Sequence, residues 1–180
     1  AVQRRRSGYR FDARGEPGDG AAEDRGVQPG PQSIAEEGGV VAGPLGSRLV
    51  VPAGAASEPV VVELIVVDDF AAYGSGERPL QAPLRLVVRA AAEPDRPAWL
   101  RAPTPHSPLE LDLPAPPGGT WLSTHGLVAV PGRPPVPAFG AIAEGRLRLP
   151  LLLIPGELIV APVRSERFRA TAAGRTEWGS

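Results

Sequence analysis

The chain has 180 residues, a formal net charge of −1, and neither cysteine nor methionine. Such a balanced charge provides no overall field that would attract nucleic acid or an anionic membrane, and the lack of cysteine excludes disulfides, thiolate nucleophiles and the usual cysteine-based zinc sites. No apolar run approaches the roughly 20 residues of a membrane-spanning helix. Glycine (22 residues) and proline (23 residues) favour turns, short strands or disorder over helices, and the length suits one domain, or one domain with an appended tail.

Residues 1–46 are rich in glycine, proline, arginine and acidic residues, with only scattered apolar ones. Because this segment buries little apolar surface to offset the entropy lost on ordering, we expect a flexible or surface-draped arm. Its basic end carries Arg4, Arg5, Arg6 and Tyr9, which either anchor the arm on an acidic partner or on phosphates, or form a solvated terminus. No apolar segment follows these arginines, so we expect no signal peptide, and the compartment is left open.

The strongest strand signal is the apolar run 59–67, which is interrupted only by Glu63. The run is too rich in β-branched residues for a helix, and we predict that it is the central strand of a sandwich, buried on both faces for much of its length. The preceding segment, 47–51, ends at a proline and is predicted to be a first, edge strand. Residues 68–79, with Gly74 and Gly76, are predicted to form a loop.

Further strands are expected at a spacing of about ten residues, each bounded by a turn signal. They are 84–88, 109–113, 120–124 with 126–130 (as two strands or one bent strand), 136–143, 145–154, 157–163 and 166–171. Pro155 and Gly156 predict a turn that makes 145–154 and 157–163 a hairpin, whereas 90–108 is expected to be irregular. The pattern predicts an all-β fold: a single Ig-like or transthyretin-like β-sandwich over 47–171, with a tail at 172–180.

Part of this pattern resembles a known family. The apolar strand ends in Asp68-Asp69-Phe70, a loop leads to Arg78-Pro79-Leu80, and Leu111-Asp112-Leu113-Pro114 comes shortly before Pro117-Gly118. This order is similar to that of the carboxypeptidase-regulatory-like (transthyretin-like) β-sandwich modules, over about residues 59–130. The resemblance implies a non-catalytic module with an accessory, adhesive or assembly role.

Few residues suggest metal binding or catalysis. The candidate metal ligands are Asp68, Asp69 and Glu77, whose oxygens suit calcium, although the two aspartates also suit the capping of a strand end and turn hydrogen bonds. A nucleophilic triad drawn from Ser123, His125 and Asp112 is not expected, because no glycine-rich elbow flanks the serine. We therefore expect no enzyme activity and no cofactor.

Aromatic and arginine side chains suggest binding surfaces. The tryptophans Trp99, Trp121 and Trp178 either form a sugar-stacking platform or serve as packing residues or interface anchors. Arginines alternate along several expected strands, as at Arg146 and Arg148. These form either solvated outer faces that protect strand edges or a recognition face for an acidic partner.

The sequence thus predicts a non-enzymatic structural or accessory β-sandwich subunit that binds other protein chains or assembles with itself, in a surface or phage-tail-like assembly. The candidate partner-binding residues are Arg4, Arg5, Arg6, Tyr9, Arg146, Arg148 and Trp178. The alternative is a carbohydrate- or calcium-binding module that uses the loop 68–79.

Overall fold

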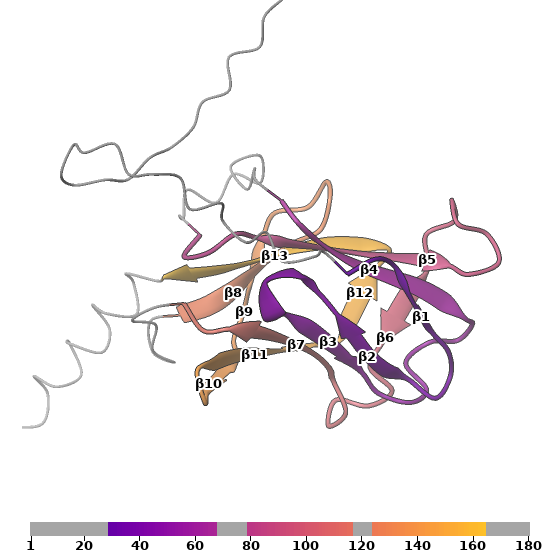
Figure 1. Cartoon of the computed structure of the whole chain (residues 1–180), viewed down its shortest axis with the longest axis horizontal. Coiled ribbons are helices and arrows are strands. Elements are labelled where there is room, and N and C mark those ends of the chain that lie inside the picture. The colour runs from indigo at the N-terminus through magenta and orange to yellow at the C-terminus, as the bar shows by residue number, and fades with distance from the viewer. Residues whose placement is uncertain (1–28, 68–78, 117–123, 165–180) are drawn as a thin grey trace, which may run out of the picture.

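Two β-sheets pack against each other, and a short two-stranded ribbon lies at one end of them (Figure 1). The computed structural model describes residues 29–67, 79–116 and 124–164. Within these residues nearly all regular structure is β-strand, apart from one 3-10 turn, η1 (Pro44–Gly46). The predicted all-β sandwich is confirmed.

The larger sheet has six strands, each antiparallel to its neighbours. In spatial order they are β1 (Gln32–Ile34), β4 (Val60–Val66), β5 (Leu84–Ala90), β13 (Glu157–Arg164), β8 (Thr124–Ala129) and β9 (Val136–Ala138).

The smaller sheet has five antiparallel strands and packs its apolar face on that of the larger one. In spatial order they are β10 (Ala141–Ala143), β11 (Arg146–Leu151), β7 (Leu109–Pro114), β3 (Arg48–Val51) and β2 (Gly39–Ala42). The separate ribbon pairs β12 (Leu153–Pro155) with β6 (Trp99–Arg101).

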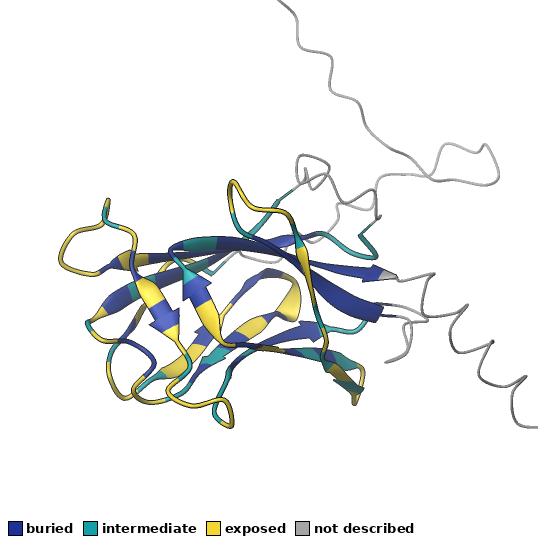
Figure 2. Ribbon diagram, turned by 180° about the vertical axis from the view of Figure 1, so that it is seen from behind, coloured by how far each residue is buried: buried dark blue, intermediate teal, exposed yellow. Residues whose placement is uncertain are grey.

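The core lies between the sheets, and Figure 2 shows the buried residues in dark blue along the strands of both sheets. The leucines at alternate positions of β5, β7 and β11 are fully buried or nearly so: Leu84, Leu86, Leu109, Leu111, Leu113, Leu147, Leu149 and Leu151. Each contributes roughly 1.5–3 kcal/mol by leaving water, and this burial is what fixes the two sheets face to face.

Both sides of the sandwich are closed by short strands that pass from one sheet to the other. On one side the chain leaves β1, at the edge of the six-stranded sheet, and enters β2, at the edge of the five-stranded sheet. On the other side it leaves β9 and enters β10 in the same way. The edges of the two sheets are therefore linked covalently at both sides.

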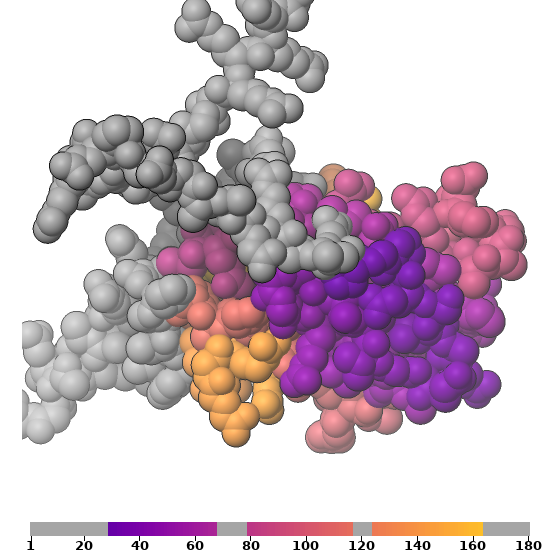
Figure 3. All heavy atoms as spheres, viewed as in Figure 1, coloured from indigo at the N-terminus to yellow at the C-terminus, as the bar shows by residue number. Residues whose placement is uncertain are grey.

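The predicted arm over 1–46 requires a correction, because its last part belongs to the sandwich. Residues 32–34 and 39–42 form β1 and β2, and their side chains Ile34 and Val41 are buried in the core. Figure 3 shows the indigo atoms of this first described segment packed against the rest of the molecule. Each strand also pairs along its length with a neighbour, β1 with β4 and β2 with β3, so this segment of low overall hydropathy belongs to the two sheets. Residues 1–28 lie outside the described part of the chain.

Two strand placements were also wrong. The run predicted to be central, β4, is the second strand of its sheet and alternates between buried and half-buried residues instead of being buried on both faces. The predicted edge strand, β3, lies between β2 and β7. The strand whose residues are all buried is β8, because its outward Leu127 joins Ile159, Ala161 and Val163 in a second apolar cluster.

The predicted hairpin between 145–154 and 157–163 does not form. β11 pairs with β7 and β10, whereas β13 pairs with β5 and β8 in the other sheet. The alternation breaks at Leu152, so that Leu153 is exposed and Ile154 is buried. The chain then forms β12, which pairs with β6 inside the segment predicted to be irregular, and turns at Gly156 (φ 64°) into β13. The predicted strand 166–171 lies outside the described residues.

Candidate functional site

An exposed face of the β6–β12 ribbon is the first candidate site. In β6, Leu100 points into the core while Trp99 and Arg101 point outward. The register places Arg101 opposite Leu153 and Trp99 opposite Pro155. Because cross-strand neighbours share a face, these four side chains form one mixed aromatic, aliphatic and cationic surface.

This surface forms part of an open groove of about 780 Å³. One wall is the turn between β3 and β4, which contributes Gly54, Ala55 and Ser57, and the other is the segment 102–105 after β6. Leu152 and Leu153 complete the lining. The volume falls within the usual range for ligand pockets, roughly 300–1,000 Å³. We call this site the ribbon groove.

The walls of the ribbon groove are held by backbone hydrogen bonds. The Arg101 N–H donates to the Ala55 carbonyl at 2.9 Å, and the Ala102 N–H donates to the Leu152 carbonyl at 2.9 Å. Ala56 also forms an isolated β-bridge with Leu100. The groove is therefore formed by paired backbone, and its shape does not depend on side-chain rotamers alone.

A bidentate ion pair braces the same end of the molecule. Arg96 donates from Nη1 to Glu58 Oε1 at 2.9 Å and from Nη2 to Oε2 at 2.5 Å. The hydrogen bonds from Arg96 lower the pKa of Glu58, an effect that partial burial opposes. Because Glu58 follows Ser57 and Arg96 shortly precedes Trp99, the pair ties one wall of the groove to the start of the ribbon.

Three large apolar side chains of the ribbon groove are exposed. Trp99 is 60% exposed, Leu152 is 59% exposed and Leu153 is 39% exposed. Of the alternatives for Trp99, a role as a packing residue is thus ruled out. Because these exposed apolar side chains line one groove, the groove is a candidate contact surface.

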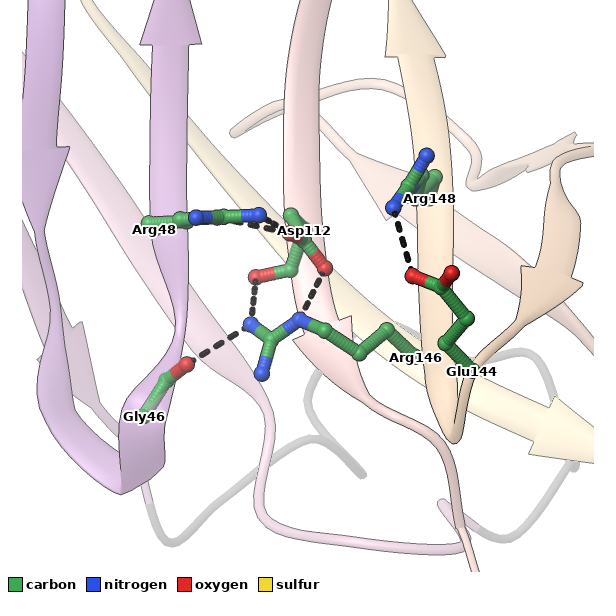
Figure 4. A network of polar contacts seen from close by, with 6 residues as sticks. All are labelled: Gly46, Arg48, Asp112, Glu144, Arg146 and Arg148. Carbon is green, nitrogen blue, oxygen red and sulfur yellow. Dashed lines mark hydrogen bonds and ion pairs between the residues drawn. The ribbon is translucent and has the colours of Figure 1, made fainter.

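A second candidate lies on the outer face of the five-stranded sheet, at the predicted residues Arg146 and Arg148 (Figure 4). Asp112 of β7 is completely buried although it points away from the core, because two arginines cover it. Arg48 Nε donates to Asp112 Oδ2 at 2.7 Å, and Arg146 Nε donates to Oδ1 at 2.6 Å. Arg146 Nη2 also donates to the Gly46 carbonyl at 2.8 Å.

These contacts set the charge state of Asp112. Burial alone would raise the pKa of its carboxyl group, but the hydrogen bonds and positive charges of Arg146 and Arg48 outweigh that effect and hold the pKa below its usual value. Asp112 is therefore ionised, and its single negative charge is shared between the two arginines that bind it. Arg148 has its own partner in Glu144, at 3.6 Å. The cluster thus joins β3, β7, β11 and η1 internally, and because its three arginines face two carboxylates, most of its positive charge is already paired.

The remaining candidates are placed as follows. Eight of them lie outside the described residues: Arg4, Arg5, Arg6, Tyr9, Asp68, Asp69, Glu77 and Trp178. His125 is buried on the outer face of the six-stranded sheet with its ring 5.6 Å from that of Phe139, whereas Asp112 lies on the outer face of the opposite sheet. The structure therefore does not bring His125 and Asp112 together.

The described residues hold no group of three or more histidine, aspartate or glutamate side chains arranged for a metal ion. They also include no helix long and apolar enough to cross a membrane. Comparisons with protein-family models, curated proteins and solved structures find no match to this chain.

The ribbon groove was missed at the level of sequence, although one signal for it was present. Trp99-Leu100-Arg101 alternates outward, inward and outward between Pro97 and Pro103. Prolines on both sides indicate a very short strand at an edge, where an outward tryptophan has no sheet to pack on. This local signal could not predict that Leu152 and Leu153 also line the groove, because they come from a segment about 50 residues further along the chain.

Proposed function

We propose that this chain is a non-enzymatic β-sandwich module that binds other protein chains, and that the ribbon groove is its contact surface. The observation that carries this proposal is the exposure of Trp99 beside Arg101 and the two leucines, on a backbone framework that is already fixed. Tryptophan and arginine are the residue types most enriched among those that dominate the energy of protein interfaces. The resemblance to transthyretin-like modules, still a prediction, agrees with an accessory or structural role in a surface or phage-tail-like assembly.

A comparison of two exposed positions tests the proposal. The tagged full-length protein, the variant Trp99→Ala and the control variant Val40→Ala are used to recover partners, which are identified by mass spectrometry, purified and titrated against all three. Val40 is 58% exposed on β2, nearly as exposed as Trp99, and does not line the groove. We expect Trp99→Ala to weaken binding by about 30-fold or more and Val40→Ala to leave it unchanged. Partners that bind all three proteins equally would overturn the assignment of the groove.

The alternative function, calcium or carbohydrate binding through the loop 68–79, rests on residues outside the described part of the chain. It stays a prediction, and titration calorimetry with calcium chloride and a glycan panel measures it directly. Heat released by the parent protein but not by an Asp68→Ala/Asp69→Ala variant is the result that this alternative requires.

A further inference from the structure

We infer that the ribbon groove binds an extended peptide segment in which an apolar residue and an acidic residue are two positions apart. This inference rests on the proposed function and names the chemistry of the partner. It follows from the charge of Arg101, from its spacing to Trp99, and from the aliphatic lining around both.

Arg101 differs from most other arginines of the sandwich because it has no ion-pair partner among the described residues. Arg48 and Arg146 bind Asp112, Arg85 binds Glu157, Arg96 binds Glu58, and Arg148 binds Glu144. Arg89 and Arg133 also lack such a partner, but neither lines the groove. A single exposed guanidinium on a contact surface is complementary to a carboxylate, which it can bind through two parallel hydrogen bonds.

The spacing along β6 sets the spacing in the partner. Trp99 and Arg101 lie two residues apart on one face of a strand, which corresponds to roughly 6.6 Å. An extended peptide that runs along β6 also presents its residues i and i+2 on one face. An apolar residue against Trp99 therefore places the residue two positions away against Arg101, in whichever direction the peptide runs.

The lining favours a polypeptide over the other ligands that tryptophan and arginine can bind. Leu152 and Leu153 offer aliphatic surface, against which the hydroxyl groups of a sugar would find no hydrogen-bond partner. A nucleic acid strand would require several cations along its phosphates, whereas Arg101 is the only arginine among the groove residues described. A peptide with an apolar side chain and one carboxylate fits both the leucines and the single charge.

Selection from a random peptide library tests the inference without requiring an identified partner. Linear twelve-residue peptides displayed on phage are selected on the immobilised full-length protein, and enriched sequences are synthesised with a fluorescent label. Binding is then measured by fluorescence anisotropy, for each peptide and for its counterpart with the acidic residue changed to lysine. We expect enriched peptides to share an aspartate or glutamate two positions from an apolar residue.

A charge reversal supplies the decisive measurement. We expect Arg101→Glu to weaken binding of the acidic peptide roughly five- to tenfold and to restore binding of its lysine counterpart. Arg133→Glu, which reverses an exposed charge away from the groove, should change neither affinity. Because Arg101 and Arg133 are both exposed, unchanged thermal melting of the variants will show that folding is intact.

The outcomes separate the two proposals. Peptides that depend on Trp99 but show no acidic preference, and that bind Arg101→Glu as well as the parent protein, overturn this inference and leave the proposed function standing. Selection that yields no peptide dependent on Trp99 overturns the inference as well, while the partner titrations with Trp99→Ala decide the proposed function independently.

Discussion

Asp112 is the residue at which local sequence and tertiary structure differ most. The alternation Leu109-Glu110-Leu111-Asp112-Leu113 predicts an outward, solvated aspartate, and the side chain does point outward. It is nevertheless buried, because Arg48 and Arg146 fold over it from the two neighbouring strands. These arginines are 64 and 34 residues away in sequence, so no local pattern could have predicted the contact.

At this scale we predict that Asp112→Asn destabilises the protein by about 1–3 kcal/mol, because a neutral amide leaves two arginines and a buried polar site without their charge-assisted hydrogen bonds. The free energy of unfolding is measured by urea denaturation at pH 7. Glu144→Gln is the matched control: Glu144 is well exposed and pairs with Arg148 at 3.6 Å, so its loss should cost less than about 0.5 kcal/mol.

The pH dependence gives an independent reading of the same variant. Because the pKa of Asp112 is lower in the folded state, its stabilising effect is fully present above the unfolded-state value of about 3.9 and is lost as the pH falls through the folded-state pKa. The stability difference between the parent protein and Asp112→Asn should be constant from pH 6 to 8 and should shrink below about pH 4. A difference that stays constant through acid pH would contradict the ionised state assigned to Asp112.

At the scale of elements, the close approach of backbone where strands pass between sheets requires glycine. Gly140 lies between β9 and β10, and a Cβ atom added there would stand 1.9 Å from the carbonyl oxygen of Arg148 in β11. Gly38, between β1 and β2, has φ 74°, and a Cβ atom added there would stand 2.3 Å from the carbonyl oxygen of Val51. A change of side-chain rotamer cannot relieve a clash between a Cβ atom and a backbone carbonyl oxygen. Glycine at these two positions therefore allows the chain to pass from one sheet to the other.

We predict that Gly140→Ala destabilises the protein by about 2 kcal/mol or more, because β10 must move away from β11 to admit the methyl group. Gly30→Ala is the control, since nothing lies within 4 Å of a Cβ atom at that position. Both free energies of unfolding are measured by urea denaturation. Equal stability of the two variants would show that β9 and β10 do not cross as described.

A side chain covers the edge of β2, where the chain first passes from one sheet to the other. The side chain of Gln32 in β1 donates from Nε2 to the Ala42 carbonyl at 2.7 Å and accepts from the Ala42 N–H at 3.0 Å. Its amide therefore occupies hydrogen-bonding groups at the edge of β2 that a further strand would otherwise use. Natural sheets commonly protect their edges by such means.

At the scale of the whole molecule, the boundary of the sandwich lies earlier in the chain than composition suggests. Val41 and Val40 are adjacent in β2, yet Val41 is fully buried in the core and Val40 is 58% exposed. Because the two valines differ so much in burial, substituting each of them tests whether β2 belongs to the folded sandwich.

We predict that Val41→Ala lowers the free energy of unfolding by about 2 kcal/mol, through lost burial and the cavity left behind, whereas Val40→Ala changes it by less than about 0.5 kcal/mol. Urea denaturation of the full-length variants measures both values. If both substitutions were without effect, β2 would not be part of the folded unit.

The sequence by itself determined which residues face inward, because a strand has a period of two and one face of each strand must leave water. The leucines of β5, β7 and β11 follow from that rule alone. Only the tertiary structure decided which strands are neighbours, since every strand carries the same backbone hydrogen-bonding groups and a local pattern cannot distinguish one partner from another. The two wrong strand placements, the hairpin that does not form, the burial of Asp112 and the exposure of Trp99 beside Leu152 and Leu153 all depend on that choice of neighbours.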